Sequence, residues 1–199
     1  MWCSPLEVSN IFILIPLNTK MHHEIVGEMS QWLKIILSSE SVQGDSARLL
    51  CRSGAIQLEE GNLFSGTGWL IFTANGKIKE FFLGDADSII VSRNTLLASD
   101  ITVDQEDLST NYLPLVRVSG PGSIFIAGGG DFIEYFLEVE ETAEVRTPSI
   151  VALDNTISFQ IGSQFSSITG PGAVLLTSII EIEKKQESPE KGFSLFDQL

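Results

Sequence analysis

Pairs of glycines at three places in the chain have the spacing found in nucleotide-binding loops. The pairs are Gly66 and Gly68, Gly120 and Gly122, and Gly170 and Gly172. The dinucleotide-binding fingerprint also needs a third glycine three residues after the second, and a helix that follows it. Ile71, Phe125 and Leu175 occupy that third position. We therefore predict no cofactor here and interpret the six glycines as structural, in hairpin turns that need a positive φ.

Histidine is the scarcest residue that could hold a metal or act as a base. His22 and His23, adjacent near the start of the chain, are the only two. A catalytic metal centre needs about three protein ligands from separate strands, and a Ser-His-Asp or Cys-His mechanism needs a well-placed base. We interpret the histidines as a solvent-exposed pair and predict no metal. A metal-dependent, cupin-like enzyme that uses Asp and Glu instead is the least favoured alternative.

Two pairs of carboxylates recur at matching positions and could serve as a general acid and base. They are Asp100 with Asp154, and Glu80 with Glu134. Paired carboxylates perform this role in glycosidases. However, an Asp that follows a strand commonly accepts hydrogen bonds from backbone N–H groups, and an acid between apolar neighbours lies on the solvent face of a strand. We therefore predict structural roles for all four, no catalytic residues, and no enzyme activity.

Most of the chain is built from an internal repeat. When 65–68 is aligned with 119–122, the match continues without a gap, so that Gly76 falls on Gly130 and 81–83 falls on 135–137. The glycine pair occurs again at Gly170, followed by a similar apolar run. A companion apolar element occurs at 49–59, 90–100 and 144–154. The sequence therefore predicts about three copies of one unit, with a period of roughly 50 residues.

Short apolar runs bounded by Gly, Pro, Asn or Asp are typical of strands joined by turns. The predicted strands are 33–37, 49–58, 69–72, 78–83, 88–91, 96–103, 115–118, 124–127, 132–139, 150–153, 157–161 and 174–180. Residues 24–37 are the best place for a helix, although Gly27 interrupts the pattern. So many short strands predict an all-β fold, a β-sandwich of jelly-roll or double-stranded β-helix type.

The repeat also sets the expected domain boundaries. We expect residues 1–20 to be an N-terminal extension, with Met21 as a candidate start, because 21–25 reads as the beginning of a domain. Residues 21–182 form one repeated β-domain, since a sheet protein of this length usually has a single core. Residues 183–199 are rich in Glu, Lys, Ser and Pro up to Gly192, and we predict a disordered polar tail.

Charge and cysteine usage restrict the partners and the compartment. Twelve Lys and Arg against 26 Asp and Glu give a net charge of −14, which opposes nucleic acids and anionic surfaces. Cys3 and Cys51 make no disulfide framework, so we expect a reducing, cytoplasmic location. The longest apolar run, 11–17, is far shorter than the roughly 20 residues of a membrane span.

The chain resembles the family of the altered inheritance of mitochondria proteins, whose fold is similar to that of the tryptophan RNA-binding attenuator protein. The segments that carry the resemblance are 52–56, 66–68 leading to Gly76, 96–100, 119–122 and 169–172. The link at 59–66 is much shorter than the glycine-rich link of typical members. The resemblance implies a double-stranded β-helix that self-associates, without an established catalytic activity and without catalytic residues to carry over.

Three functions remain open at this point. The first is a non-catalytic structural or interaction module that forms a homo-oligomer, with an unidentified protein partner as a further possibility. The second is a module that binds a small ligand or RNA, although an acidic chain without a basic groove is a poor match for RNA. The third is the cupin-like enzyme. Phe81, Phe82, Tyr135 and Phe136 suit either the core or an oligomer interface, and we favour the core.

Overall fold

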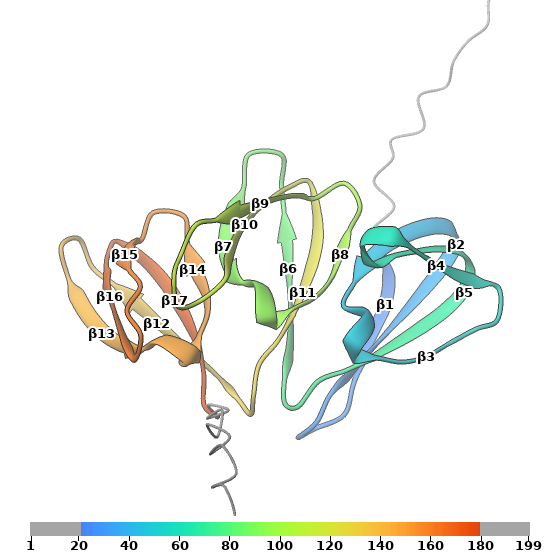
Figure 1. The fold of residues 1–199 in the computed structure, drawn as a ribbon, viewed down its shortest axis with the longest axis horizontal. Helices are drawn as coiled ribbons and strands as arrows, with labels where there is room; N and C mark the ends of the chain where they lie inside the picture. Colours follow the sequence, from blue (N-terminus) through green and yellow to red (C-terminus); the bar gives the residue numbers. More distant parts are fainter. Residues whose placement is uncertain (1–20, 180–199) are drawn as a thin grey trace, which may run out of the picture.

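The computed structural model describes residues 21–179, which form three β lobes side by side in a row (Figure 1). The predicted extension 1–20 and the predicted tail 183–199 lie outside the described residues. Strands and short 3₁₀ turns make up the lobes, and the strands pair antiparallel in several sheets. The prediction of an all-β fold is therefore confirmed.

The first lobe contains a long hairpin. Its elements are β1 (His22–Val26), β2 (Trp32–Gly44), η1 (Ser46–Arg48), β3 (Leu49–Arg52), β4 (Ile56–Glu59), η2 (Glu60–Asn62) and β5 (Leu63–Thr73). Strand β1 pairs with β2, and the turn between them contains Gly27 with φ +105°. Alternate residues of β2, beginning with Leu33 and Ile35, are buried. No helix forms at 24–37, because this alternation suits a strand with one face on the core.

The second and third lobes share one order of elements. The second contains β6 (Ile78–Leu83), β7 (Ser88–Ser92), η3 (Arg93–Thr95), β8 (Leu96–Asp100), β9 (Asp104–Leu108), β10 (Leu115–Ser119) and β11 (Gly122–Ala127). The third contains β12 (Phe132–Leu137), β13 (Thr142–Arg146), η4 (Thr147–Ser149), β14 (Ile150–Asp154), β15 (Ser158–Gln160), β16 (Phe165–Thr169) and β17 (Gly172–Thr177). In both lobes a 3₁₀ turn separates the second strand from the third.

The sheets run across the boundaries between lobes. An eight-stranded sheet has the order β3-β5-β2-β8-β11-β6, with β1 on β2 and β4 on β5. A six-stranded sheet has the order β12-β17-β14-β7-β10-β9, and a three-stranded sheet has the order β13-β16-β15. The β2–β8 pair therefore joins the first lobe to the second, and the β7–β14 pair joins the second to the third. Three clusters of buried apolar side chains make up the core.

The order of elements aligns the first lobe with the other two differently from the sequence pattern. Strand β3 follows a 3₁₀ turn, as β8 and β14 do, so Leu49 is equivalent to Leu96 and Ile150. The sequence alignment had instead placed 49–59 beside 90–100. A local bulge supports the corrected equivalence, since the pairing partners skip Leu50 in β3, Leu97 in β8 and Val151 in β14. The predicted strand 49–58 is also broken, because 53–55 form a turn.

Candidate functional site

The six glycines predicted as turns occupy corners of the fold. Gly66 and Gly68 lie within β5, Gly120 follows β10 and Gly122 begins β11, and Gly170 follows β16 and Gly172 begins β17. Strands β10 and β11 are in different sheets, and so are β16 and β17. The prediction of hairpin turns is therefore wrong. At the second and third glycine pairs the chain instead crosses from one sheet to another, a step that local sequence does not reveal, whereas Gly66 and Gly68 lie inside one long strand.

Backbone conformation explains four of these glycines, and close packing explains the other two. Gly66, Gly68, Gly122 and Gly172 have φ of +124°, +152°, +148° and +144°. A Cβ atom at Gly120 would lie 2.2 Å from the carbonyl oxygen of Gly84, and one at Gly170 would lie 2.2 Å from that of Glu138. Any side chain at these two positions would clash with a neighbouring backbone.

At each of the three glycine pairs, a polar side chain at an equivalent position accepts a hydrogen bond from a backbone N–H group. Ser53 Oγ accepts from Trp69 N at 3.2 Å, Asp100 Oδ2 from Ser123 N at 2.7 Å, and Asp154 Oδ2 from Ala173 N at 2.8 Å. Asp100 and Asp154 are the last residues of the third strand in their lobes, Ser53 follows the third strand of the first lobe, and each donor follows the second glycine of its pair. Asp100 and Asp154 thus bind backbone N–H groups, as the structural interpretation expects.

His23 is not the solvent-exposed residue that the sequence predicted, whereas His22 is exposed. The His23 side chain is 13% exposed, and its Nε2 lies 3.1 Å from Oε2 of Glu80. Its Nδ1 donates to the carbonyl oxygen of Met21 at 2.9 Å, and its ring meets Phe125 edge-on. No sequence pattern indicates this contact, because the two strands β1 and β6 belong to different lobes.

The acids Glu80 and Glu134 each contact a basic side chain of a neighbouring lobe. Glu80 on β6 pairs with His23 on β1, and Glu134 on β12 lies 2.8 Å from Nζ of Lys79 on β6. Both acids had been predicted to lie on a solvent face, which fits Glu134 but not Glu80, whose side chain is 21% exposed. The acids therefore contribute to the contacts between neighbouring lobes.

The contacts around Glu80 differ from those of a nucleophile and its base. Glu80 Oε1 accepts from Ser123 Oγ at 3.0 Å, so the carboxylate lies between the histidine and the serine. A Ser-His-Asp mechanism needs the histidine against the hydroxyl. Burial raises the pKa of nearby Asp100, the charges of Glu40 and Glu80 raise it further, and the hydrogen bond from Ser123 N–H opposes this. The arrangement links β1 to the second lobe.

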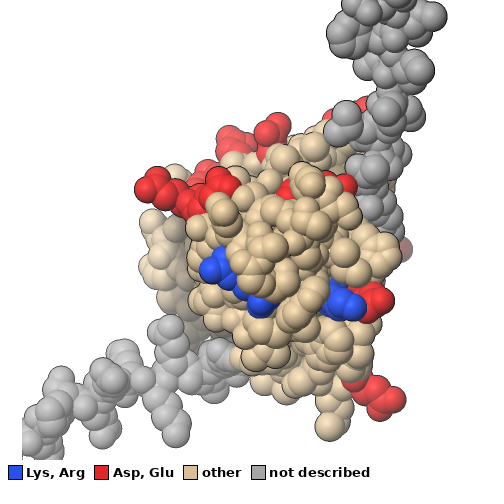
Figure 2. Space-filling view, turned by 90° about the vertical axis from the view of Figure 1, so that its right-hand side faces the viewer, with Lys and Arg blue, Asp and Glu red and all other residues tan. Residues whose placement is uncertain are grey.

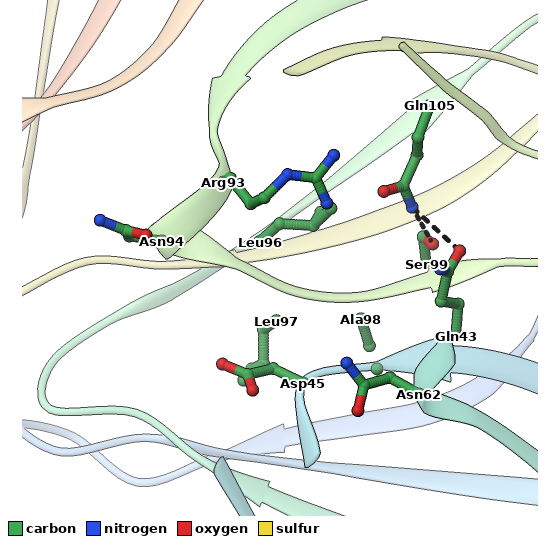
Figure 3. Close-up of a pocket in the computed structure, with 11 residues that line it drawn as sticks. Gln43, Asp45, Asn62, Arg93, Asn94, Leu96, Leu97, Ala98, Ser99 and Gln105 are labelled. Atoms are coloured by element: carbon green, nitrogen blue, oxygen red, sulfur yellow. Dashed lines mark hydrogen bonds between the residues drawn. The ribbon is translucent and has the colours of Figure 1, made fainter. Parts of the chain in front are cut away.

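A pocket of about 270 Å³ lies beside the β2–β8 pair (Figure 3). Gln105 Nε2 donates to Gln43 Oε1 at 3.2 Å and to Ser99 Oγ at 3.1 Å, which joins the two lobes across the pocket. Asn62 and Asn94 add amides to the wall, and Leu96, Leu97 and Ala98 line it with apolar surface. Arg93 is engaged by Asp107, since its Nε donates to Oδ1 at 2.9 Å. The carboxylate of Asp45, which also lines the pocket, is paired with Arg48 at 3.4 Å. Because amides both donate and accept, the pocket suits a small, neutral, polar molecule.

A wider groove of about 840 Å³ follows the turns η1, η3 and η4. Among the described residues that line it, Arg48 and Arg146 carry the charge, and none is acidic. Arg48 is partly neutralised, because its Nε lies 3.4 Å from Oδ2 of Asp45. Arg146 has no acidic partner in the described chain, and its guanidinium lies 5.3 Å from the centre of the Phe165 ring. The groove is therefore locally cationic on an acidic protein.

The described residues offer few other sites for chemistry. Residues 21–179 contain no group of three His, Cys, Asp or Glu that could hold a metal ion. Cys51 is exposed and unpaired. Over the same range, no helix has the length and apolar character of a membrane span.

Comparisons with known proteins agree with this all-β arrangement. The family described as Mitochondrial biogenesis AIM24 has a model that matches residues 66–179. A crystal structure of a protein from Streptococcus pyogenes superimposes with a TM-score of 0.70 at 15% sequence identity, over 81% of this chain and 94% of that one. At this identity the likeness shows the fold alone. No functionally curated protein matches the chain.

Proposed function

The chain belongs to the Mitochondrial biogenesis AIM24 family, whose description names a cellular process and no reaction, and from this premise we propose that it is a non-catalytic interaction module that associates with copies of itself. The observation that carries the proposal is the exposure of Leu50. Its side chain is 66% exposed, whereas the equivalent Leu97 and Val151 are 0% exposed. Both buried equivalents lie where a neighbouring lobe pairs with their strand.

The end of the molecule around Leu50 resembles a junction between lobes whose partner strand is missing. Leu58 and Trp69 are also exposed in this lobe. Figure 2 shows that much of this end is uncharged, with most of the acidic side chains towards its upper edge and a few basic ones across its middle. An exposed apolar patch and an unpaired strand edge both favour association.

The test is the mass of the full chain by light scattering after size exclusion, at micromolar concentration. We expect an integral multiple of 21.7 kDa, and a shift towards the monomer for Leu50→Lys, because a charge there opposes burial in an interface. Met29→Lys is the matched control, since Met29 is 86% exposed and lies outside the strands. A monomeric wild-type chain would overturn the proposal.

We extend the proposal to the architecture and the location. Each lobe is one of about three repeats of a double-stranded β-helix, similar to the attenuator-protein fold. The equivalent corner hydrogen bonds of Ser53, Asp100 and Asp154 support this interpretation. A reducing, cytoplasmic location accords with the unpaired Cys51.

The second candidate function is binding of a small ligand, and the two cavities favour it. The amide-lined pocket beside Gln43 suits a neutral polar molecule, and the groove beside Arg146 suits an anion. An RNA strand is a poorer match, because its phosphates would meet a net charge of −14 outside the groove. Saturable binding by a protein that stays monomeric would favour this function over self-association.

A further inference from the structure

The two junctions between lobes have the same register. At the first junction, Val42 lies opposite Asp100 and Gly44 lies opposite Ala98. At the second, Ile89 lies opposite Asp154 and Val91 lies opposite Ala152. These pairs occupy equivalent positions, since β8 and β14 each follow the 3₁₀ turn of their lobe and share a bulge. The chain therefore uses one type of strand pairing twice.

At each end of the row, one strand has a free edge at the position where an internal junction between lobes would form. In the third lobe, β13 takes the place of β7, and among the described strands it pairs only with β16. In the first lobe, β3 takes the place of β8, and within residues 21–179 it pairs only with β5. Figure 1 shows β13 and β3 at opposite ends of the molecule. Each end therefore presents the free edge of one of the two strands that such a junction needs.

We propose that the chain associates head to tail, with β13 of one copy pairing antiparallel with β3 of the next in the register of its own lobe junctions. This inference rests on the proposed self-association and identifies its edges and its partner. The repeated register places Val145 opposite Cys51 and Glu144 opposite Arg52. Such a heterologous contact produces a ring if the rotation closes, and a filament if it does not.

Charge and exposure at the two ends match this arrangement. Glu144 and Arg52 are exposed, and neither has an ion-pair partner within the described chain. The residues equivalent to them at the internal junctions are uncharged, Gln43 opposite Ser99 and Ile90 opposite Leu153. Opposite charges at directly opposed strand positions stabilise pairing, whereas like charges oppose it. The ends thus carry a complementary pair in place of neutral residues.

Disulfide cross-linking tests the register directly. Opposed residues of antiparallel strands have Cα atoms about 4.5–5.5 Å apart, which a disulfide can bridge. In a Cys3→Ser background, we expect Val145→Cys to give covalent dimers and higher multiples through Cys51 under mild oxidation. Glu144→Cys is the matched control, because its side chain points to the other face of the strand. Adding Cys51→Ser to Val145→Cys must abolish the products.

A charge exchange provides a second test that leaves buried side chains intact. We expect Glu144→Arg and Arg52→Glu each to weaken association about 5- to 10-fold, and the double variant to restore it. An oligomer without the Val145→Cys cross-link and insensitive to both single variants would overturn the register while leaving self-association intact. A monomeric wild-type chain would overturn both proposals.

Discussion

His23 Nε2 lies 3.1 Å from Oε2 of Glu80, and this contact joins the first strand of the first lobe to the first strand of the second. The same carboxylate accepts from Ser123 on β11. Lys79 and Glu134 join the second lobe to the third in a similar position. Neighbouring lobes are thus connected by polar side chains as well as by paired strands, so variants at these contacts should affect how the lobes hold together.

His23→Ala is expected to lower the free energy of unfolding by about 1–2 kcal/mol, because it leaves a half-buried carboxylate without one of its partners. His22→Ala is the matched control, since His22 is exposed, and we expect a change of less than about 0.5 kcal/mol. Urea denaturation of both variants and of the wild type measures the difference. Equal effects of the two substitutions would contradict the proposed role of the His23–Glu80 contact.

Asp100→Asn tests the raised pKa of a carboxyl group that is buried near Glu40 and Glu80. A raised folded-state pKa means that the folded protein keeps this proton to a higher pH than the unfolded chain. The contribution of Asp100 to stability therefore falls as pH rises from its ordinary value of 3.8 through the raised value. Asparagine does not ionise, so the variant does not lose stability in this way as pH rises. Its side-chain oxygen can still accept the hydrogen bond from Ser123 N.

We expect Asp100→Asn to be at least as stable as the wild type at neutral pH, and to lose less stability between about pH 4 and pH 7. Urea denaturation across this range gives the comparison. Asp154→Asn controls for the loss of a carboxylate at the equivalent backbone hydrogen bond. A marked destabilisation of Asp100→Asn at neutral pH would show that the fold requires the charge, which would contradict this account.

Apolar sequence patterns revealed most of the strands, whereas contacts between lobes could not be predicted from them. The runs at 78–83 and 124–127 are strongly apolar, and both form strands there. Strands β1, β9, β13 and β16 were missed, and the exposed, charged residues of β9 and β13 give little apolar alternation. The amide pocket was missed for a different reason. Gln43, Ser99 and Gln105 come from separate strands, and the sequence does not show that those strands are neighbours.

The three glycine pairs show a similar limit to what the sequence can predict. The repeated spacing predicted six glycines with a positive φ, and four of them have one, but a hairpin and a crossing between sheets use the same residue type. Only the pairing of β10 and β11 with other strands distinguishes the two. Gly120 illustrates the same point, because its constraint is the nearby backbone of Gly84 rather than its own torsion angles.

Gly122→Ala is expected to destabilise the protein by about 1–3 kcal/mol, since φ is +148° and a Cβ would lie 2.7 Å from Cγ2 of Val103. Gly54→Ala is the control, because a Cβ there would meet no atom within 4 Å. We expect the control to be neutral or slightly stabilised. Thermal unfolding of both variants gives the ranking, and a neutral Gly122→Ala would contradict the assignment of this residue to a strained corner.

The cationic groove should bind a small phosphate compound, and inorganic pyrophosphate is a suitable probe. At physiological ionic strength the Debye length is about 8 Å, so a small anion inside the groove experiences mainly Arg146 and Arg48 rather than the net charge of the whole protein. Isothermal titration of the full chain should show saturable binding. Arg146→Gln should weaken it about tenfold or more, because a charge-assisted hydrogen bond contributes roughly 1.5–3 kcal/mol.

Arg117→Gln is the matched control for this loss, since Arg117 is engaged by Glu106 at 2.9 Å and does not line the groove. We expect its affinity for pyrophosphate to equal that of the wild type. Equal weakening by the two substitutions would indicate a general charge effect, and absence of saturation at millimolar pyrophosphate would exclude a phosphate site. Binding that depends on Arg146 alone would establish that the groove recognises anions, because the two variants change the net charge by the same amount.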